Sequence, residues 1–353
     1  MSRKFEKIEL RFAQSQNALV LQQSDLSLSS ISDMVKSGAI DISPKYQRRE
    51  RWDPIKESGL IESFLLNIPV PPIYLAEDEY GTYSVIDGKQ RVTAINKFLN
   101  GELHLEQLDK FKELDGLSFD ELPISLSNAL RIRPYLRVVT LLRQSDPELK
   151  HEVFLRLNKA GVALNSQEIR NVAYRGAFND LLFDLSKNEY LSTQLKATPG
   201  SKTYKEMVDV QYVLRFFTMR EFYKNFPGNM DKAMDVFMGE HYKMGPRSIA
   251  QCKVIFNKSI DFCRRIWGAE GFMKPGGNTR VLQGFFDIQM VCASLLSEAE
   301  RENAVAKKNK VKELLSSRIN RDMEFADSLT QFTSNPENVK LRIETFCEML
   351  KSV

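Results

Sequence analysis

One stretch, residues 83–95 with the sequence YSVIDGKQRVTAI, limits the folds open to this chain more than any other. Its first part is rich in β-forming residues, and its last part repeats apolar residues at helical spacing. Between them stands the pair Asp87-Gly88, a turn signal in which the glycine can take a positive φ. The stretch therefore predicts a strand, a two-residue turn and a helix.

The first turn of that helix would carry Lys89, Gln90 and Arg91. Unpaired backbone N–H groups and the positive end of the helix dipole favour an anion at such a position. A lysine adds charge there, and an arginine adds a planar fork that suits phosphate. The unit thus fits a phosphate site for a nucleotide or a nucleic-acid backbone. An ordinary capped helix explains the spacing equally well, because the glycines of a Walker A loop are missing.

A basic and aromatic segment precedes this unit, between Pro44 and Pro54. Basic side chains interleaved with aromatic ones suit phosphates and bases, by charge and by stacking. The simpler alternative is an exposed basic loop that Trp52 anchors to the core. Asp53-Pro54 at its end predicts a helix start, with the aspartate as N-cap. The members of the segment are Lys45, Tyr46, Arg48, Arg49, Arg51 and Trp52.

Composition excludes some classes of function. The 50 basic and 46 acidic residues give a net charge of +4, which is too small to indicate nucleic acid by itself. No apolar run approaches the roughly 20 residues that a membrane helix needs. The N-terminus has no apolar signal region, so we expect a cytoplasmic protein without a membrane partner.

The residues that usually bind metal ions are widely scattered. The histidines, His104, His151 and His241, lie far apart, and the four cysteines show no paired spacing, which argues against a zinc site and a Cys–His nucleophile. Carboxylates, phosphates and water would then have to hold any metal, which points to Mg²⁺.

The periodicity predicts an α+β chain in three parts. Residues 1–27 are polar and are expected to form a loose arm or an edge element. Residues 28–175 alternate short strands and helices around a mixed α/β core. Residues 176–353 are almost entirely helical, with breaks at Pro-Gly and Gly-Pro pairs.

A polar helix–loop–helix closes the second part. Asn165 stands three residues before Glu168, which is the spacing of a capping box. Asn158 and Glu168 either help to close a pocket or serve only turn and capping chemistry.

Four segments together resemble the ParB/sulfiredoxin-like domain at the N-terminal end of GmrSD-type (type IV) restriction enzymes. Each is weak alone, but the order and spacing of the set are specific. Lys89 stands where that family usually has a glutamine. The segments are YQR at 46–48 with Trp52, IES at 61–63 through PVPPI at 69–73, IDGKQR at 86–91, and FLRLN at 154–158 with Gly161, Leu164 and Glu168.

The resemblance implies a nucleotide-binding core linked to NTP hydrolysis and to the sensing of foreign or modified DNA. In related proteins a separate His-Asn-His-type nuclease domain cuts. The three scattered histidines argue against such a nuclease domain in this chain. We therefore expect a stand-alone member that works with a partner nuclease or cuts DNA with its own core. The nucleotide (ATP, GTP or CTP) is not distinguished, and homo-oligomerisation is left open.

Chemistry and resemblance together assign roles to the site residues. Asp87, Gln90 and Arg91 would be catalytic, with Mg²⁺ at Asp87 bridging phosphates. The phosphate-binding set is Tyr46, Arg48, Gly88, Lys89 and Arg91; the DNA-binding set is Arg48, Arg49, Arg51 and Trp52; the supporting pair is Asn158 and Glu168.

Two other functions fit the same residues. A non-enzymatic DNA-binding or regulatory module would use the basic turn only to grip phosphates, with salt-sensitive binding and no turnover. A stand-alone, Mg²⁺-dependent endonuclease would nick DNA at the same turn.

Overall fold

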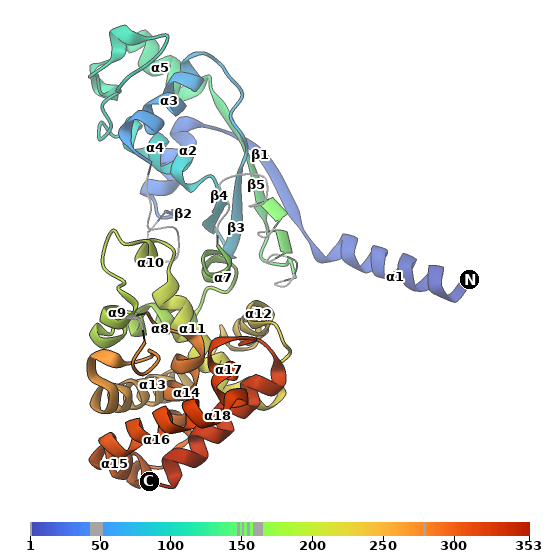
Figure 1. The fold of residues 1–353 in the computed structure, drawn as a ribbon. Helices are drawn as coiled ribbons and strands as arrows, with labels where there is room; N and C mark the ends of the chain where they lie inside the picture. Colours follow the sequence, from blue (N-terminus) through green and yellow to red (C-terminus); the bar gives the residue numbers. More distant parts are fainter. Residues whose placement is uncertain are drawn as a thin grey trace. The chain divides into compact units, whose positions relative to one another are not determined.

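The computed structural model describes residues 2–42, 52–146, 149, 152–153, 156–157, 165–277 and 280–353. It consists of two compact units, Met1–Ala173 and Tyr174–Val353, each with its own core (Figure 1). The α+β class expected from the periodicity is confirmed. Within the described ranges, none of the helices combines the length and apolar character that a membrane crossing requires.

The first unit is built on a five-stranded mixed sheet of order β1-β5-β3-β4-β2. β3 and β4 form an antiparallel hairpin, β1 pairs antiparallel with β5, and the β3–β5 and β2–β4 pairs are parallel. Opposite Asp87, at the end of β4, lies Tyr74 near the start of β3. The strands are β1 (Leu21–Ser27), β2 (Ile40–Asp41), β3 (Ile73–Glu79), β4 (Thr82–Asp87) and β5 (Tyr135–Leu141).

Helices and alternating strand residues bury both faces of this sheet. Leu75 and Val85 belong to the main core, in which α2, α3 and α4 also take part, whereas the adjacent Ala76 and Ile86 join a smaller cluster with Ile169 of α7. This alternation follows from the two-residue period of a strand. The helices are α1 (Ser2–Ala18), α2 (Leu28–Lys36), α3 (Pro54–Leu65), α4 (Lys89–Leu99), α5 (Ile124–Ile132) and α7 (Ser166–Ala173), with short 3₁₀ turns at Lys112–Leu114 and Phe119–Glu121.

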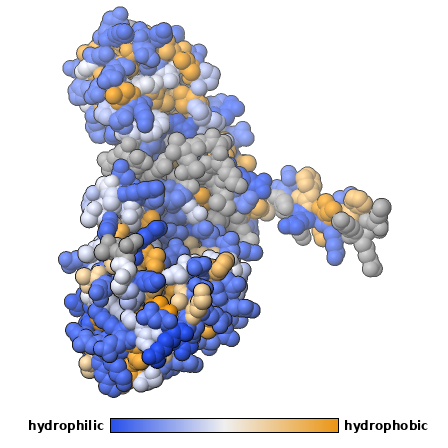
Figure 2. Space-filling view, viewed as in Figure 1, coloured by the Kyte–Doolittle hydropathy of each residue, from blue (hydrophilic) through white to orange (hydrophobic). Residues whose placement is uncertain are grey.

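The N-terminal segment contains a helix and an edge strand, and the strand corresponds to the edge element that was one of the two expectations for residues 1–27. Residues 2–18 form α1, and Leu21–Ser27 form the edge strand β1, which pairs with β5 over its whole length. Its sequence, LQQSDLS, is mostly polar, as suits an edge strand with an exposed face. α1 leaves Phe5, Ile8, Leu10 and Phe12 exposed, and apolar side chains reach its surface in Figure 2.

A single buried carboxylate holds the loop that follows α4. Glu62 on α3 accepts hydrogen bonds from the backbone N–H groups of Asp109, Lys110 and Phe111, with N–O distances of 3.2, 2.6 and 3.1 Å. Burial raises the pKa of Glu62, but these three amide bonds outweigh it and hold the pKa below its ordinary value of 4.5. The charged form of Glu62 therefore stabilises the fold.

Glu62→Gln should lower the free energy of unfolding of the first unit by about 1–3 kcal/mol near pH 7, because amide donors lose a charged acceptor. The folded pKa lies below the unfolded one, so this stabilisation is complete above pH 4.5 and is lost as the pH falls through the lowered pKa. Urea unfolding at about pH 7 and about pH 3.5 should show the difference shrinking. Glu113→Gln, at an exposed position nearby, is the control; a pH-independent difference would contradict this role.

The second unit is a helical assembly around α14. Ten residues of α14 are buried, including Phe285, Phe286 and Ile288, so the helix is covered on every side. The helices are α8 (Ala177–Leu185), α9 (Glu189–Leu195), α10 (Lys202–Lys205), α11 (Val208–Phe222), α12 (Met230–His241), α13 (Pro246–Trp267), α14 (Gln283–Leu295), α15 (Glu298–Ala306), α16 (Lys308–Arg321), α17 (Met323–Thr330) and α18 (Pro336–Lys351).

A buried charge triad joins three of these helices. Asp287 of α14 accepts two hydrogen bonds from the guanidinium of Arg215 on α11, both at 2.7 Å, and one from Arg342 on α18 at 2.6 Å. Arg342 also donates to the carbonyl oxygens of Ser328 and Thr333. Asp287 and Arg342 are fully buried and Arg215 nearly so. The carboxylate is therefore the only acidic partner that these two buried cations have in the described hydrogen-bond network.

Candidate functional site

The turn between β4 and α4 is built around Gly88. Its φ of +92° lies in the left-handed region, and it serves as the N-cap of α4 without a side-chain hydrogen bond. A Cβ at this position would lie 2.5 Å from Cγ2 of Ile73, the first residue of β3. Backbone conformation and the close approach of β3 thus both require glycine here. Lys89, Gln90 and Arg91 occupy the first turn of α4, as the spacing predicted.

Arg91 ties this turn to the preceding segment of the chain. Its Nη1 donates to the carbonyl oxygens of Pro71 and Pro72, and its Nη2 donates to Oδ2 of Asp87 at 2.6 Å. Its side chain is only 12% exposed, whereas that of Asp87 is 44% exposed. The proline segment, the end of β4 and the start of α4 are therefore fixed together by one guanidinium. Asp87 does not cap the helix, because its carboxylate is turned to Arg91 instead.

Two further predicted residues meet at the same turn. Oε1 of Gln90 accepts a hydrogen bond from the backbone N–H of Trp52 at 3.2 Å. The Trp52 side chain is half-buried against the main core of the first unit, as expected of an anchor. The remaining basic and aromatic candidates (Tyr46, Arg48, Arg49 and Arg51) and Asn158 lie outside the described residues.

Glu168 has a structural position at the start of α7. Its Oε2 accepts from the backbone N–H of Asn165 at 2.8 Å, while its own N–H donates to Oδ1 of Asn165 at 2.9 Å. These two reciprocal bonds are the capping box that the spacing indicated. The carboxylate is buried at the helix start, so we assign it the capping role.

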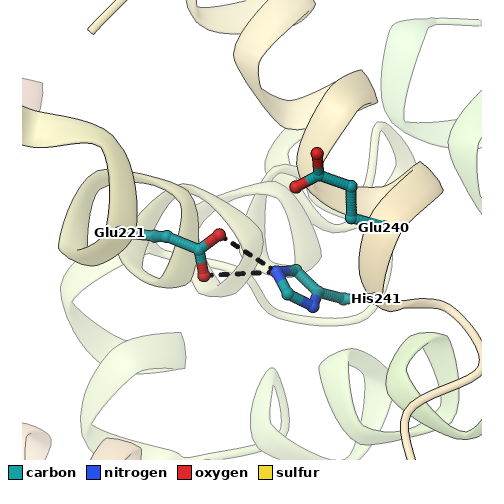
Figure 3. Close-up of side chains that lie close together, drawn as sticks. All are labelled: Glu221, Glu240 and His241. Carbon is teal, nitrogen blue, oxygen red and sulfur yellow. Dashed lines mark hydrogen bonds and ion pairs between the residues drawn. The ribbon is translucent and has the colours of Figure 1, made fainter. Parts of the chain in front are cut away.

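The structure also assembles a group that spacing did not reveal. Glu221 lies in the last turn of α11, and Glu240 and His241 lie at the end of α12. Their side chains lie close together at the surface (Figure 3). The sequence argued against a histidine-based metal site, because the three histidines lie far apart along the chain. Only the packing of α11 against α12 brings the three together, and no local pattern encodes that packing.

The fold and the turn define a class of protein: a mixed α/β domain with an anion-suited strand–turn–helix junction, followed by a helical unit. Residues 31–175 match the family model described as the GmrSD restriction endonuclease, N-terminal domain. This part of the chain is therefore similar to that domain family, and the expected resemblance is confirmed. No curated protein and no solved structure matches the chain.

Proposed function

We propose that this chain binds a nucleoside triphosphate with Mg²⁺ at the Asp87–Arg91 turn and hydrolyses it while acting on or sensing DNA in a restriction or phage-defence setting. The observation that carries the proposal is the start of α4. A left-handed glycine opens the helix, no side chain caps it, and a lysine stands in its first turn. The family of residues 31–175 supports the restriction setting.

We propose a separate role for each residue of the turn. The first-turn amides and Lys89 would hold phosphate oxygens, and Gly88 lets a ligand approach the backbone closely. Asp87, with 44% of its side chain exposed, would bind Mg²⁺, and Gln90 would orient the attacking water. Arg91 acts as a positioning residue, because three of its hydrogen bonds go to the chain itself. Tyr46 and Arg48 stay proposed phosphate contacts, and Arg48, Arg49, Arg51 and Trp52 stay proposed DNA contacts.

Lys89→Ala should reduce phosphate release from the preferred nucleotide by about tenfold or more, because a charge-assisted phosphate contact is lost. Asp87→Asn should abolish the Mg²⁺-dependent part of this phosphate release. Phosphate release is measured with ATP, GTP and CTP in turn, with and without DNA. Lys36→Ala, an exposed lysine on α2, is the matched control. Turnover by Lys89→Ala at the wild-type rate would contradict the assigned phosphate site.

Arg91 separates positioning from direct contact. Arg91→Lys keeps the charge but loses the fork that reaches two carbonyls and a carboxylate at once. A positioning role predicts that activity and melting temperature fall together, and that both fall less in Arg91→Lys than in Arg91→Ala. Loss of activity at an unchanged melting temperature would instead place Arg91 on the phosphate.

Because Arg91 donates its hydrogen bonds to the chain itself, a second candidate is also favoured. This candidate is a DNA-binding or regulatory module that works with a separate nuclease. Such a module must bind the phosphates of DNA, but it does not need an arginine to contact a phosphate group that is being transferred. It predicts DNA retention that weakens steeply with salt, without nucleotide turnover in any of the three assays.

A further inference from the structure

Two helix ends in the second unit present nitrogen and oxygen donors to one point. Nε2 of His241 lies 3.2 Å from both carboxylate oxygens of Glu221. Counting Glu240, one donor atom from each of the three residues lies within 4.8 Å of the others. In Figure 3 the carboxylate of Glu221 comes from one helix, and Glu240 and His241 come from the end of another.

The position of the two glutamates near helix C-termini favours a cation close by. Glu221 lies in the last turn of α11 and Glu240 in the last turn of α12. The negative end of the helix dipole disfavours carboxylates there and favours cations. The two carboxylates, which have oxygen atoms within 4.8 Å of each other, also repel each other. A divalent cation would offset both charges and could take the imidazole as a third ligand.

The imidazole is held in place by packing. The ring of His241 lies against that of Phe237, one turn earlier in α12, with 4.2 Å between the ring centroids. Phe237 is buried and also contacts Phe178 and Phe222. The ring therefore has a fixed orientation toward Glu221, while a quarter of the His241 side chain stays open to solvent. An ion could enter without rearrangement of the core.

We propose that Glu221, Glu240 and His241 form a binding site for a zinc-class divalent transition metal, with water completing the coordination. Zinc binds imidazole nitrogen and carboxylate oxygen at about 2.0–2.2 Å in tetrahedral geometry, which puts neighbouring ligand atoms about 3.3–3.5 Å apart. The 3.2 Å separation between His241 and Glu221 already approaches this spacing. An imidazole ligand favours zinc over magnesium or calcium, which prefer oxygen. The bound ion would tie α11 to α12.

The site is independent of the proposed nucleotide site, because it lies in the second unit and outside residues 31–175. The test uses the full chain, stripped of metal by a chelator and titrated with ZnCl₂ in a calorimeter. A parallel melting experiment follows stabilisation, because an ion that binds only the folded state raises the melting temperature. Wild-type protein should bind one zinc ion at this site and melt at a higher temperature.

His241→Ala and Glu221→Gln should each weaken zinc binding by about tenfold or more and remove most of the melting shift. His104→Ala, at an exposed histidine of the first unit, should bind as wild type does. Cys252→Ser tests for binding by a thiol, because Cys252 is the one cysteine that is not fully buried. Circular dichroism of the metal-free variants checks folding. Zinc affinity that survives in His241→Ala, is lost in Cys252→Ser, or is absent from the wild type overturns the proposal.

Discussion

Asp287→Asn should lower the free energy of unfolding of the helical unit by about 3–5 kcal/mol, because it removes the charged carboxylate to which two buried guanidinium groups donate. Arg215 and Arg342 reach the carboxylate from α11 and α18, and both are shielded from solvent. An asparagine of the same shape keeps the packing but removes the charge. The loss therefore reports the electrostatic contribution rather than a cavity.

The chain offers its own spectroscopic probe for this measurement. Of the two tryptophans, Trp267 is buried in the helical unit and Trp52 belongs to the first unit. In a Trp52→Phe background, the fluorescence of Trp267 during urea unfolding follows the helical unit.

Glu302→Gln is a matched control, because Arg265 and Glu302 form the same two-bond geometry at 2.6 and 2.7 Å on the exposed surface. Solvent screens such a pair, so its loss should have a far smaller effect. If Asp287→Asn and Glu302→Gln lowered the free energy of unfolding equally, burial of the triad would not determine how much it contributes to stability.

Gly88→Ala should destabilise the first unit by roughly 2–4 kcal/mol, the sum of a left-handed backbone penalty and an overpacked contact. The added methyl group would lie 2.5 Å from the side chain of Ile73 and 3.1 Å from Nη2 of Arg91. Pushing Arg91 aside would also loosen the bond to Asp87. We expect phosphate binding to fall with stability, because the same turn presents the amides of α4.

Gly59→Ala is the opposite control. Gly59 lies within α3 at an ordinary φ, and a Cβ there meets nothing within 4 Å. Alanine should therefore stabilise the helix by about 0.5–1 kcal/mol. Hydrogen exchange in peptides covering α3 and α4 resolves the two effects. Changes of the same sign would contradict the role assigned to the turn at Gly88.

Local signals were sufficient to predict the turn. β-forming residues, an Asp-Gly pair and helical spacing place β4, Gly88 and α4 within a residue or two of their observed positions. The capping box of Asn165 and Glu168 was predictable for the same reason, since all its atoms lie within four residues.

Contacts between distant segments were not predictable. Nothing near Arg91 in the sequence indicates that its guanidinium reaches back to Pro71 and Pro72, because that contact depends on how β3 enters the sheet. The helical part also has a break that no Pro-Gly or Gly-Pro pair indicated, since Met207 takes a left-handed φ of 55° between α10 and α11. Tertiary packing overrides helical propensity there.

The end of the family match nearly coincides with the boundary between the units. The match stops at residue 175, and the first unit ends at Ala173. Because each half has its own core, recombination can replace the helical half without rebuilding the sheet that carries the Gly88 turn. The helical half is therefore the part that evolution can exchange while the sheet domain with the Gly88 turn is kept.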